Sequence, residues 1–428
     1  MTLAVTVVFG LLFFALLMAS VALHEVGHMV PAKLFGVAVP RYFVGFGRTL
    51  WSSRRGETEY GIKLWPLGGF VQLLGMYPPR RPDAKDTRLQ RFADEARAVE
   101  WDDIAPEQRD RLFYAQPVGR KLLIMAGGIT MNLLIAFGLL WGVAGLHGNL
   151  RPQPVVGEVP QCIVAGPRDD RACRPTDPRT PAAQAGLRPG DRIVSFNGQP
   201  IADYPQLQEL IRANLDREAA IVVERGGRTE ALAPVHTVVA QVPDPVDPSR
   251  RVAAGWLGLS PTLERVKEGP AEVLRDMGRA SVQSIAAIVQ FPVKVVNVVI
   301  DLATGRPRDI YSPISIVGAS AAAGEVATAG NATLGDRAAM FASLLASVNL
   351  FLALFNLVPL PPLDGGHMAG ALYEGARRTV ARWRGRPDPG PADTAKMVPV
   401  AYAMGAFLLL CGLVLIVADI FSPVKLFG

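Results

Sequence analysis

Cysteine is scarce in this sequence, and its three copies form no C-x-x-C pair. The spacing argues against a cysteine-based zinc site and against a thioredoxin-like redox motif. Cys162 and Cys173 lie in a loop-rich stretch that we place outside the cytoplasm, where they could form a disulfide or remain free thiols. Cys411 lies in an apolar run, where we expect it to pack against its neighbours.

Charge is also limited, because charged residues make up 19% of the 428 residues and hydrophobic residues make up 50%. The chain is too apolar for an ordinary soluble protein and too polar for membrane helices alone. It therefore predicts membrane spans plus at least one water-soluble domain. The net charge of +6 is modest. Its distribution does not indicate nucleic acid, since basic residues beside spans more often report topology.

Ionisable side chains are missing from Thr2 to Leu23, and then His24, Glu25 and His28 follow within five residues. Residues four apart return to nearly the same face of a helix, so the two histidines can bind one metal ion. Glu25 lies about 100° around the helix from His24, within reach of a water on that ion. This H-E-x-x-H motif is typical of zinc hydrolases, and ionisable groups inside a bilayer usually mark function.

Four apolar runs are long enough to cross a membrane, namely Thr2–Pro31, Leu122–Leu146, Ala338–Leu363 and Met397–Ala418. Polar residues interrupt the helical pattern of Val273–Ile300, which fits a membrane-surface or groove-lining helix better than a span. Between the second and third spans, the string A-x-x-A-G-L-x-x-G-D-x-I-x-x-x-N-G (182–198) precedes a predicted helix at Tyr204–Asn214 and a predicted strand at Ala219–Glu224. This pattern resembles a PDZ domain.

We therefore expect an α-helical polytopic membrane protein with four transmembrane helices, a membrane-associated β-hairpin loop and an inserted α+β PDZ-like domain. The predicted divisions are a first transmembrane helix (1–37), a β-rich membrane-associated loop (38–77), a cytoplasmic insert (78–117), a second transmembrane helix (118–148), an extracytoplasmic PDZ-like domain (149–245), membrane-surface helices (250–335), a third transmembrane helix (336–367), a cytoplasmic basic loop (368–396) and a fourth transmembrane helix (397–420).

The membrane topology follows from Met368–Lys396, a short loop rich in arginine, because such loops face the cytoplasm. With four spans, both chain ends and the PDZ-like region then lie outside. The first and third spans both run from outside to inside. His24 and His28 therefore lie at a membrane depth similar to that of Asp364.

A zinc hydrolase usually provides three protein ligands and leaves one position for water. Asp364 is the best candidate for the third ligand by depth, and His367 is its rival. We expect Glu25 to accept the proton of the attacking water and to return it to the leaving amine. Asn356 could hold a substrate or make a helix–helix hydrogen bond. Prolines cannot sustain regular helix bonding, so we expect the third span to open locally and shape a cleft at Pro359, Pro361 and Pro362.

A peptide in a membrane must be unwound before its backbone can be cut, and a strand edge offers replacement hydrogen-bond partners. Trp65–Leu74 is the predicted edge, with Gly68, Gly69 and Phe70 as candidate substrate-binding residues. The alternative is an ordinary cytoplasmic hairpin.

These features together resemble one family. The chain resembles the site-2 proteases in three features: H-E-x-x-H in the first span, N-x-x-P-x-P-x-L-D-G-G in the third span and a PDZ-like region between the second and third spans. Within that family it is most similar to the bacterial regulator of sigma-E protease type, in its form with a single PDZ domain. The resemblance implies His24, His28 and Asp364 as Zn²⁺ ligands and Glu25 as the catalytic residue. One departure is Ala126-Gly127-Gly128 before Asn132, where members commonly have A-G-P, and we expect it to be harmless.

The resemblance also implies that the enzyme lies in a cell membrane and cleaves a single-pass membrane protein, often an anti-sigma factor. Another protease has already trimmed the part of that substrate that lies outside the cytoplasm. The PDZ-like region would exclude untrimmed substrates as a steric gate, or bind a newly exposed C-terminus. Two other functions remain alternatives from the residues alone. One is a zinc transporter or sensor that uses the same cluster, and the other is an inactive PDZ-bearing membrane adaptor.

Overall fold

The chain is described by a computed structural model over residues 2–80, 86–102, 104–164, 173–245, 250–328 and 332–424. Contacts divide it into two compact units, Met1–Val143 with Pro270–Gly428, and Ala144–Gly269. Parts of the predicted insert (81–85 and 103), of the predicted PDZ-like domain (165–172) and of the predicted membrane-surface helices (329–331) lie outside the described residues. So do residues 246–249 and the chain ends at 1 and 425–428.

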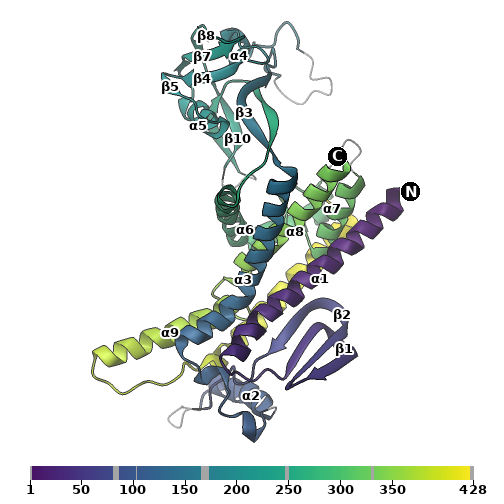
Figure 1. Ribbon diagram of the computed structural model, residues 1–428, viewed down its shortest axis with the longest axis vertical. Coiled ribbons are helices and arrows are strands. Elements are labelled where there is room, and N and C mark those ends of the chain that lie inside the picture. Colours follow the sequence, from purple (N-terminus) through teal and green to yellow (C-terminus); the bar gives the residue numbers. More distant parts are fainter. Residues whose placement is uncertain are drawn as a thin grey trace. The chain divides into compact units, whose positions relative to one another are not determined.

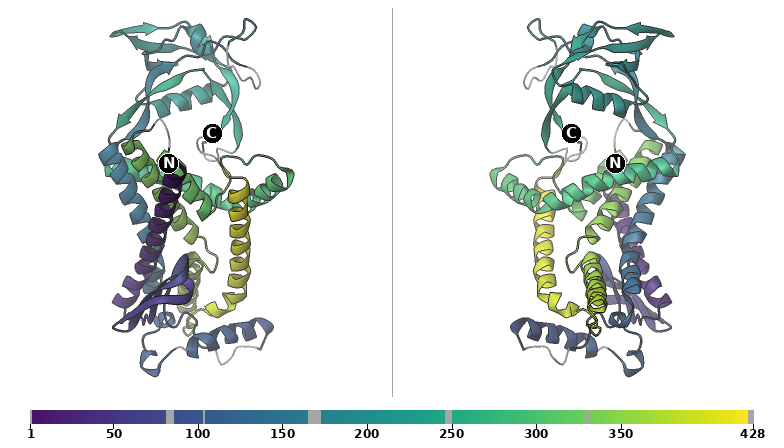
Figure 2. Two further views of the ribbon diagram at one scale, coloured as in Figure 1. Left: turned by 90° about the vertical axis from the view of Figure 1, so that its right-hand side faces the viewer. Right: turned by 90° about the vertical axis from the view of Figure 1, so that its left-hand side faces the viewer.

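The first unit is built on helices, and Figures 1 and 2 show α1, α3 and α8 running alongside one another. Phe13 and Leu17 of α1 are buried in a cluster with Ala319 and Ala323 of α7. The long helices of this unit are α1 (Thr2–Leu34), α3 (Val118–Gly142), α6 (Pro270–Thr304), α7 (Ile316–Thr328), α8 (Leu334–Asn356), α9 (Asp364–Trp383) and α10 (Val398–Phe421).

Five helices among the described residues are long and apolar enough to cross a membrane: Ala4–Leu34, Val118–His147, Pro270–Thr304, Leu334–Asn356 and Thr394–Phe421. Four of them overlap the four predicted spans. The fifth, α6, is the helix that we expected to lie on a membrane surface. Figure 2 shows α6 running crosswise to α10.

The β-rich loop consists of two long strands, β1 (Arg41–Arg55) and β2 (Thr58–Gln72), as the glycine-broken aromatic pattern predicts. Their pairing folds back on itself, since Tyr42 of β1 pairs with both Tyr60 and Val71 of β2. The first half of β1 therefore lies between the two halves of β2. Gly69–Gln72 is left at an edge, and no other strand of the described residues pairs with it.

The third predicted span is shorter than the sequence suggested. α8 ends at Asn356, and α9 begins at Asp364 after a non-helical stretch that contains Pro359, Pro361 and Pro362. The prediction that prolines open this segment is confirmed, whereas the predicted third transmembrane helix (336–367) is not one helix, because it is interrupted between Asn356 and Asp364. The predicted basic loop is also wrong in part, because α9 continues as an amphipathic helix to Trp383.

The insert between β2 and α3 contains helix α2 (Arg88–Asp102) and two short turns, η1 (Pro106–Gln108) and η2 (Phe113–Ala115). Arg97 of α2 pairs with Asp393, just before the short helix η4 (Thr394–Met397). The carboxylate of Glu100 accepts hydrogen bonds from the backbone amides of Met76 and Tyr77. The insert thus ties the end of the β-loop to the start of the last helix.

The second unit is an α+β fold whose main sheet has the strand order β12-β3-β4-β7-β8. Its core includes Ile193, Phe196 and Leu207, which are almost fully buried. The helix predicted at Tyr204–Asn214 is present as α5 with those bounds. The elements are η3 (Val143–His147), β3 (Asn149–Glu158), α4 (Pro181–Ala185), β4 (Arg192–Phe196), β5 (Gln199–Pro200), α5, β6 (Glu218–Ala219), β7 (Ile221–Arg225), β8 (Arg228–Ala231), β9 (Val235–His236), β10 (Val238–Pro243), β11 (Arg251–Trp256) and β12 (Ser260–Val266).

Two predictions about this unit need correction. The segment 250–335 was expected to form membrane-surface helices, but its first part forms β11 and β12, and β12 pairs with β3 along its length. We also expected a linker rich in proline and aspartate at Val239–Ser249, but its first part belongs to β10, which pairs with β11. Short strands that complete a distant sheet carry too little local signal to be separated from a linker.

Cys162 and Cys173 form a disulfide, which is the first of the two alternatives that the sequence left open for these residues.

Candidate metal centre

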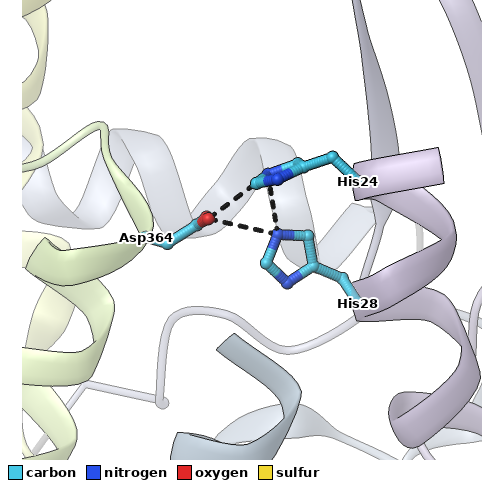
Figure 3. Close-up of side chains that lie close together, drawn as sticks. All are labelled: His24, His28 and Asp364. Atoms are coloured by element: carbon cyan, nitrogen blue, oxygen red, sulfur yellow. Dashed lines mark hydrogen bonds and ion pairs between the residues drawn. The ribbon is translucent and has the colours of Figure 1, made fainter. Parts of the chain in front are cut away.

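His24 and His28 project from one face of α1 toward Asp364, the first residue of α9 (Figure 3). Nε2 of His24 lies 3.3 Å from Oδ2 of Asp364, and Nε2 of His28 lies 3.2 Å from the same oxygen. The two Nε2 atoms are 3.2 Å apart. Both imidazoles are buried. Two segments more than three hundred residues apart in the sequence therefore meet in a group of three metal-ligand atoms.

The residues present fit zinc. Tetrahedral bonds of about 2.0–2.1 Å place neighbouring ligand atoms about 3.3–3.4 Å apart, and the three separations here are close to that value. Nδ1 of His28 lies 2.9 Å from the carbonyl oxygen of Ile124. This contact makes Nδ1 the protonated nitrogen of a neutral ring and leaves the lone pair of Nε2 for a metal. Oδ2 of Asp364 is buried without a hydrogen-bond partner in the described part of the chain.

The close approach of α1 and α3 depends on glycine. A Cβ atom on Gly27 would lie 2.4 Å from the carbonyl oxygen of Gly127, so the two backbones touch where the helices cross. A Cβ atom on Gly128 would lie 2.3 Å from Nε2 of His28 and 2.8 Å from Nε2 of His24. The α carbon of Gly128 therefore forms part of the wall against which both imidazoles rest.

Glu25 lies beside this cluster and interacts electrostatically with both histidines and with Asp364. Its Oε2 atom accepts a hydrogen bond of 2.9 Å from the backbone amide of Val71, at the edge of the β-loop. Gly69 of the same edge approaches the Glu25 side chain so closely that a Cβ would lie 3.4 Å from Cγ. The acid next to the metal ligands is thus held by the strand predicted to receive substrate.

The predicted substrate-binding residues of the β-loop lie near this edge. Gly68 lines an apolar cavity of about 620 Å³ whose lining also includes Val21 of α1 and Phe351 of α8. Gly69 lies beside Glu25, since a Cβ placed on it would be within van der Waals distance of Cγ. Phe70 does not line the cavity, and its ring stacks on those of Phe43 and Phe46. Phe70 therefore stabilises the hairpin and gives the cavity no surface.

The other predicted residues follow α8. Pro359 and Pro361 line a second cavity, of about 340 Å³, together with Tyr77 and His367. His367 does not join the metal-ligand group found among the described residues. Asn356 ends α8, and its side chain makes no hydrogen bond within the described chain. Among the described residues, the helix–helix hydrogen bond considered for Asn356 is therefore not formed.

Three features of the centre had no clear sequence signal. They are the hydrogen bond from the Val71 amide to Glu25, the contact between the Ile124 carbonyl and His28, and the close approach of Gly128 to both imidazoles. Two of these are backbone groups, which any residue type could supply. The departure at Ala126-Gly127-Gly128 was the only available hint, because consecutive glycines in an apolar helix indicate a close helix contact.

Known proteins are similar to this chain over most of its length. The model of peptidase family M50 matches residues 12–386. The chain is 33% identical over 432 residues to the zinc metalloprotease Rip1 of Mycobacterium bovis, with 98% of each chain covered. It is 34% identical over 438 residues to the Rip1 protein of Mycolicibacterium smegmatis, again with 98% of each covered. It is 30% identical over 379 residues to the metalloprotease MmpA of Caulobacter vibrioides, with 85% of each covered.

Proposed function

This chain belongs to peptidase family M50, the site-2 proteases, and from that premise we propose how its candidate metal centre works. We propose that His24, His28 and Asp364 hold the zinc ion of an intramembrane metalloprotease and that Glu25 performs the proton transfers of the reaction. The chain is a membrane zinc metalloprotease by its family. The residue roles are our proposal. The observation that carries them is the meeting of three ligand atoms at separations that fit one zinc ion.

Bound zinc would polarise the scissile peptide carbonyl and make a water molecule nucleophilic at neutral pH. Glu25 accepts the proton of that water and passes it to the nitrogen of the leaving amine. The amide of Val71 holds Oε2 of Glu25, so Oε1 is the oxygen left to receive the proton. Burial of both histidines excludes bulk water from the ligand atoms.

We place the substrate along the free edge of Gly69–Gln72. Main-chain hydrogen bonds to an exposed strand edge can replace those of an unwound transmembrane helix. The position of this edge supports the placement, since the amide of Val71 donates a hydrogen bond to Glu25 and Gly69 lies beside the Glu25 side chain. Gly68 lines the 620 Å³ cavity next to this edge, and the lining is almost entirely apolar apart from Lys294 and several hydroxyl groups. Such a cavity suits an apolar transmembrane segment. Asn356, Pro359 and Pro361 are proposed to contact the substrate beyond the cut.

The enzyme cleaves membrane-bound proteins, and we propose that its substrate is a single-pass protein already trimmed outside, such as an anti-sigma factor. We also propose that the chain crosses the cytoplasmic membrane four times. In this topology the second unit and both termini lie outside the cytoplasm. Two observations support this topology. The disulfide of Cys162 and Cys173 lies in the second unit, and such bonds persist in oxidising compartments. The crosswise course of α6 suits a membrane-surface helix.

We propose that the second unit is PDZ-like and acts as a gate against untrimmed substrates. The test is its removal, and the structure sets the limits of the deletion. β12 pairs with β3, so a cut that ends near residue 239 would leave an unpaired strand. Replacement of residues 149–266 by a flexible linker removes both strands. A gate predicts that the variant cleaves untrimmed substrate, whereas a receptor for the new C-terminus predicts that cleavage is lost.

The central test compares the wild-type chain with Glu25→Gln and His24→Ala in lipid vesicles. Glu25→Gln should keep zinc, measured by inductively coupled plasma mass spectrometry, and lose about a thousandfold in cleavage of a co-reconstituted single-pass protein. His24→Ala should lose both zinc and cleavage. Intact cleavage by Glu25→Gln would rule out the proposed base. The same variant, expressed in cells with a crosslinker, should trap the natural substrate for identification by mass.

A further inference from the structure

The C-terminal half of α9 forms a surface that has no part in the proposed proteolytic site. Leu372, Ala376, Val380 and Trp383 recur at helical spacing, so they share one face of the helix. This face is open, because the exposed fractions are 57% for Leu372, 42% for Val380 and 84% for Trp383. An apolar face of this kind marks a site of interaction with a membrane or another molecule.

Beside this face, α9 and the chain that follows it form an open hollow of about 440 Å³, a size usual for a ligand site. Three guanidinium groups line it, and none of its lining residues carries a carboxylate. The three arginines are Arg377, Arg384 and Arg386, and Ala376 and Val380 of the apolar face also line the hollow.

One of the three arginines is held in place by the protein itself. A nitrogen of the Arg377 guanidinium donates a hydrogen bond of 3.1 Å to the carbonyl oxygen of Pro389. The same group lies over the ring of Tyr373, with Cζ 5.6 Å from the ring centroid. Arg377 therefore joins the returning loop to the helix and fixes the shape of the hollow without using a carboxylate.

The other two arginines keep their charge uncompensated. Arg378, which lies outside the hollow, already pairs with Glu374 at 3.0 Å and lies 3.6 Å from Asp388. By contrast, no carboxylate in the described part of the chain pairs with Arg384 or Arg386, and both side chains are exposed. The hollow is thus a concentrated positive site beside an apolar helix face.

We propose that this hollow binds the phosphate headgroup of an anionic phospholipid, whose acyl chains lie along the face formed by Leu372, Val380 and Trp383. Arginine forms paired hydrogen bonds to phosphate oxygens. A helix with tryptophan and apolar residues on one face and arginines at its borders is suited to the headgroup region of a bilayer. The chain is a membrane protein by family, so it is surrounded by phospholipids.

Charge complementarity favours this occupant over the alternatives. A soluble phosphate would satisfy the arginines but leave the apolar face uncovered. A second copy of the chain would cover the face but would bring the same arginines toward each other in a symmetric contact. An anionic lipid is the ligand that satisfies both parts of the surface.

The test uses the full chain in a neutral detergent, titrated with dioctanoyl phosphatidylglycerol and followed by native mass spectrometry. We expect saturable binding that is at least about tenfold tighter than for dioctanoyl phosphatidylcholine. Arg384→Gln with Arg386→Gln should weaken it by about 30-fold, as expected for two basic residues at an anionic surface. The matched control, Arg91→Gln with Arg382→Gln, removes the same charge from exposed positions outside the hollow and should change binding less than threefold.

Four results would overturn the proposal. Equal binding of the two lipids would show an apolar face without charge recognition. Equal losses in the arginine pair and its control would show a diffuse charge effect. Glycerol 3-phosphate binding as tightly as the lipid would assign the surface to a soluble anion. A wild-type dimer that Val380→Asp dissociates would likewise overturn the proposal, by assigning the surface to a second copy. If the arginine pair fails to fold, Val380→Asp is the substitute. It places a carboxylate in the lining, so unchanged lipid binding in Val380→Asp would count equally against the site.

Discussion

The backbone amide of Val71 donates a hydrogen bond of 2.9 Å to Oε2 of Glu25, which joins the edge of the β-loop to the acid beside the metal-ligand group. This bond has two consequences. It orients the carboxylate that we propose as the base, and it sets the distance between that base and a peptide bound along the same edge. Positioning of the base and of the substrate are therefore coupled through one strand.

Val71→Pro tests this coupling, because proline has no amide hydrogen to donate. Proline is tolerated at a sheet edge, so the hairpin should survive. A hydrogen bond to a charged group contributes about 1.5–3 kcal/mol, and cleavage should therefore fall by about tenfold to a hundredfold. The measurement is the initial rate of substrate cleavage in vesicles, with zinc content determined in parallel and expected to be unchanged.

The matched control for this change is Val71→Ala, which shortens the same side chain but keeps the amide. It should retain most of the activity. If Val71→Ala and Val71→Pro lose activity equally, the side chain and not the amide supports the reaction.

Gly128→Ala is predicted to damage the metal centre directly. The new methyl group would lie 2.3 Å from Nε2 of His28, so one or both imidazoles must move away from Asp364. We expect zinc affinity to fall by at least about tenfold, as when the supports of a metal ligand are removed. Competition with a zinc chelator, read out as the zinc bound per chain, measures the change.

The same helix offers a control in Gly138→Ala, where nothing lies within 4 Å of the added carbon. Helix propensity favours alanine by about 1 kcal/mol, so this variant should be at least as stable as the wild type and keep its zinc. Loss of zinc in both variants would point to a general effect on α3.

The three residues of the candidate metal centre were accessible from the sequence for a physical reason. His24 and His28 are four residues apart on one helix, so their proximity is set by local geometry alone. Asp364 could be matched to them only through membrane depth and family resemblance. His367 remained a rival until the structure showed which side chain faces the histidines.

The remainder of the centre could not be predicted, because it depends on contacts between distant backbones. Val71 and Ile124 act through main-chain groups, and Gly128 acts through the lack of a side chain. The fold shows the same limit. The helices with strong apolar or amphipathic patterns were located well, whereas β10–β12 are short and acquire their form only by pairing with other strands. α9 was missed because its arginines resemble those of a cytoplasmic loop.

The second unit should lose stability in acid through Asp191. Its carboxylate is almost fully buried, and burial alone would raise its pKa. Hydrogen bonds from the Arg225 guanidinium, at 2.7 and 2.8 Å, outweigh burial and hold the pKa of Asp191 below its ordinary value. The folded pKa is therefore lower than the unfolded one, so the carboxylate stabilises the fold above about pH 4. This stabilisation is lost as the pH falls through the lowered pKa.

Hydrogen–deuterium exchange of β4 and β7 in the full chain measures this effect, after correction for the intrinsic exchange rate at each pH. Protection in the wild type should fall below about pH 4. Asp191→Asn should already be less protected at pH 7, and its protection should change less with acid. An acid response equal to that of the wild type in Asp191→Asn would assign the effect to other carboxylates.

The buried pair of Lys121 and Glu374 should be essential for the stability of the first unit. Nζ of Lys121 lies 2.8 and 3.0 Å from the two carboxylate oxygens of Glu374, and both side chains are less than 5% exposed. Glu374 also accepts a hydrogen bond from the amide of Ala392 and pairs with Arg378. One carboxylate therefore joins α3, α9 and the loop before α10.

Glu374→Ala leaves the ammonium of Lys121 buried without a counter-charge, which should destabilise the unit by about 3–5 kcal/mol. Asp388→Ala is the control, since Asp388 also lies near Arg378 but is 63% exposed, and it should cost less than about 1 kcal/mol. Lys121→Met combined with Glu374→Leu removes both charges and should recover much of the loss, because a buried pair can be replaced by apolar groups at little cost. Thermal unfolding in detergent compares the three. A double variant as unstable as Glu374→Ala would show that the Ala392 and Arg378 contacts, and not the buried ammonium, account for the loss.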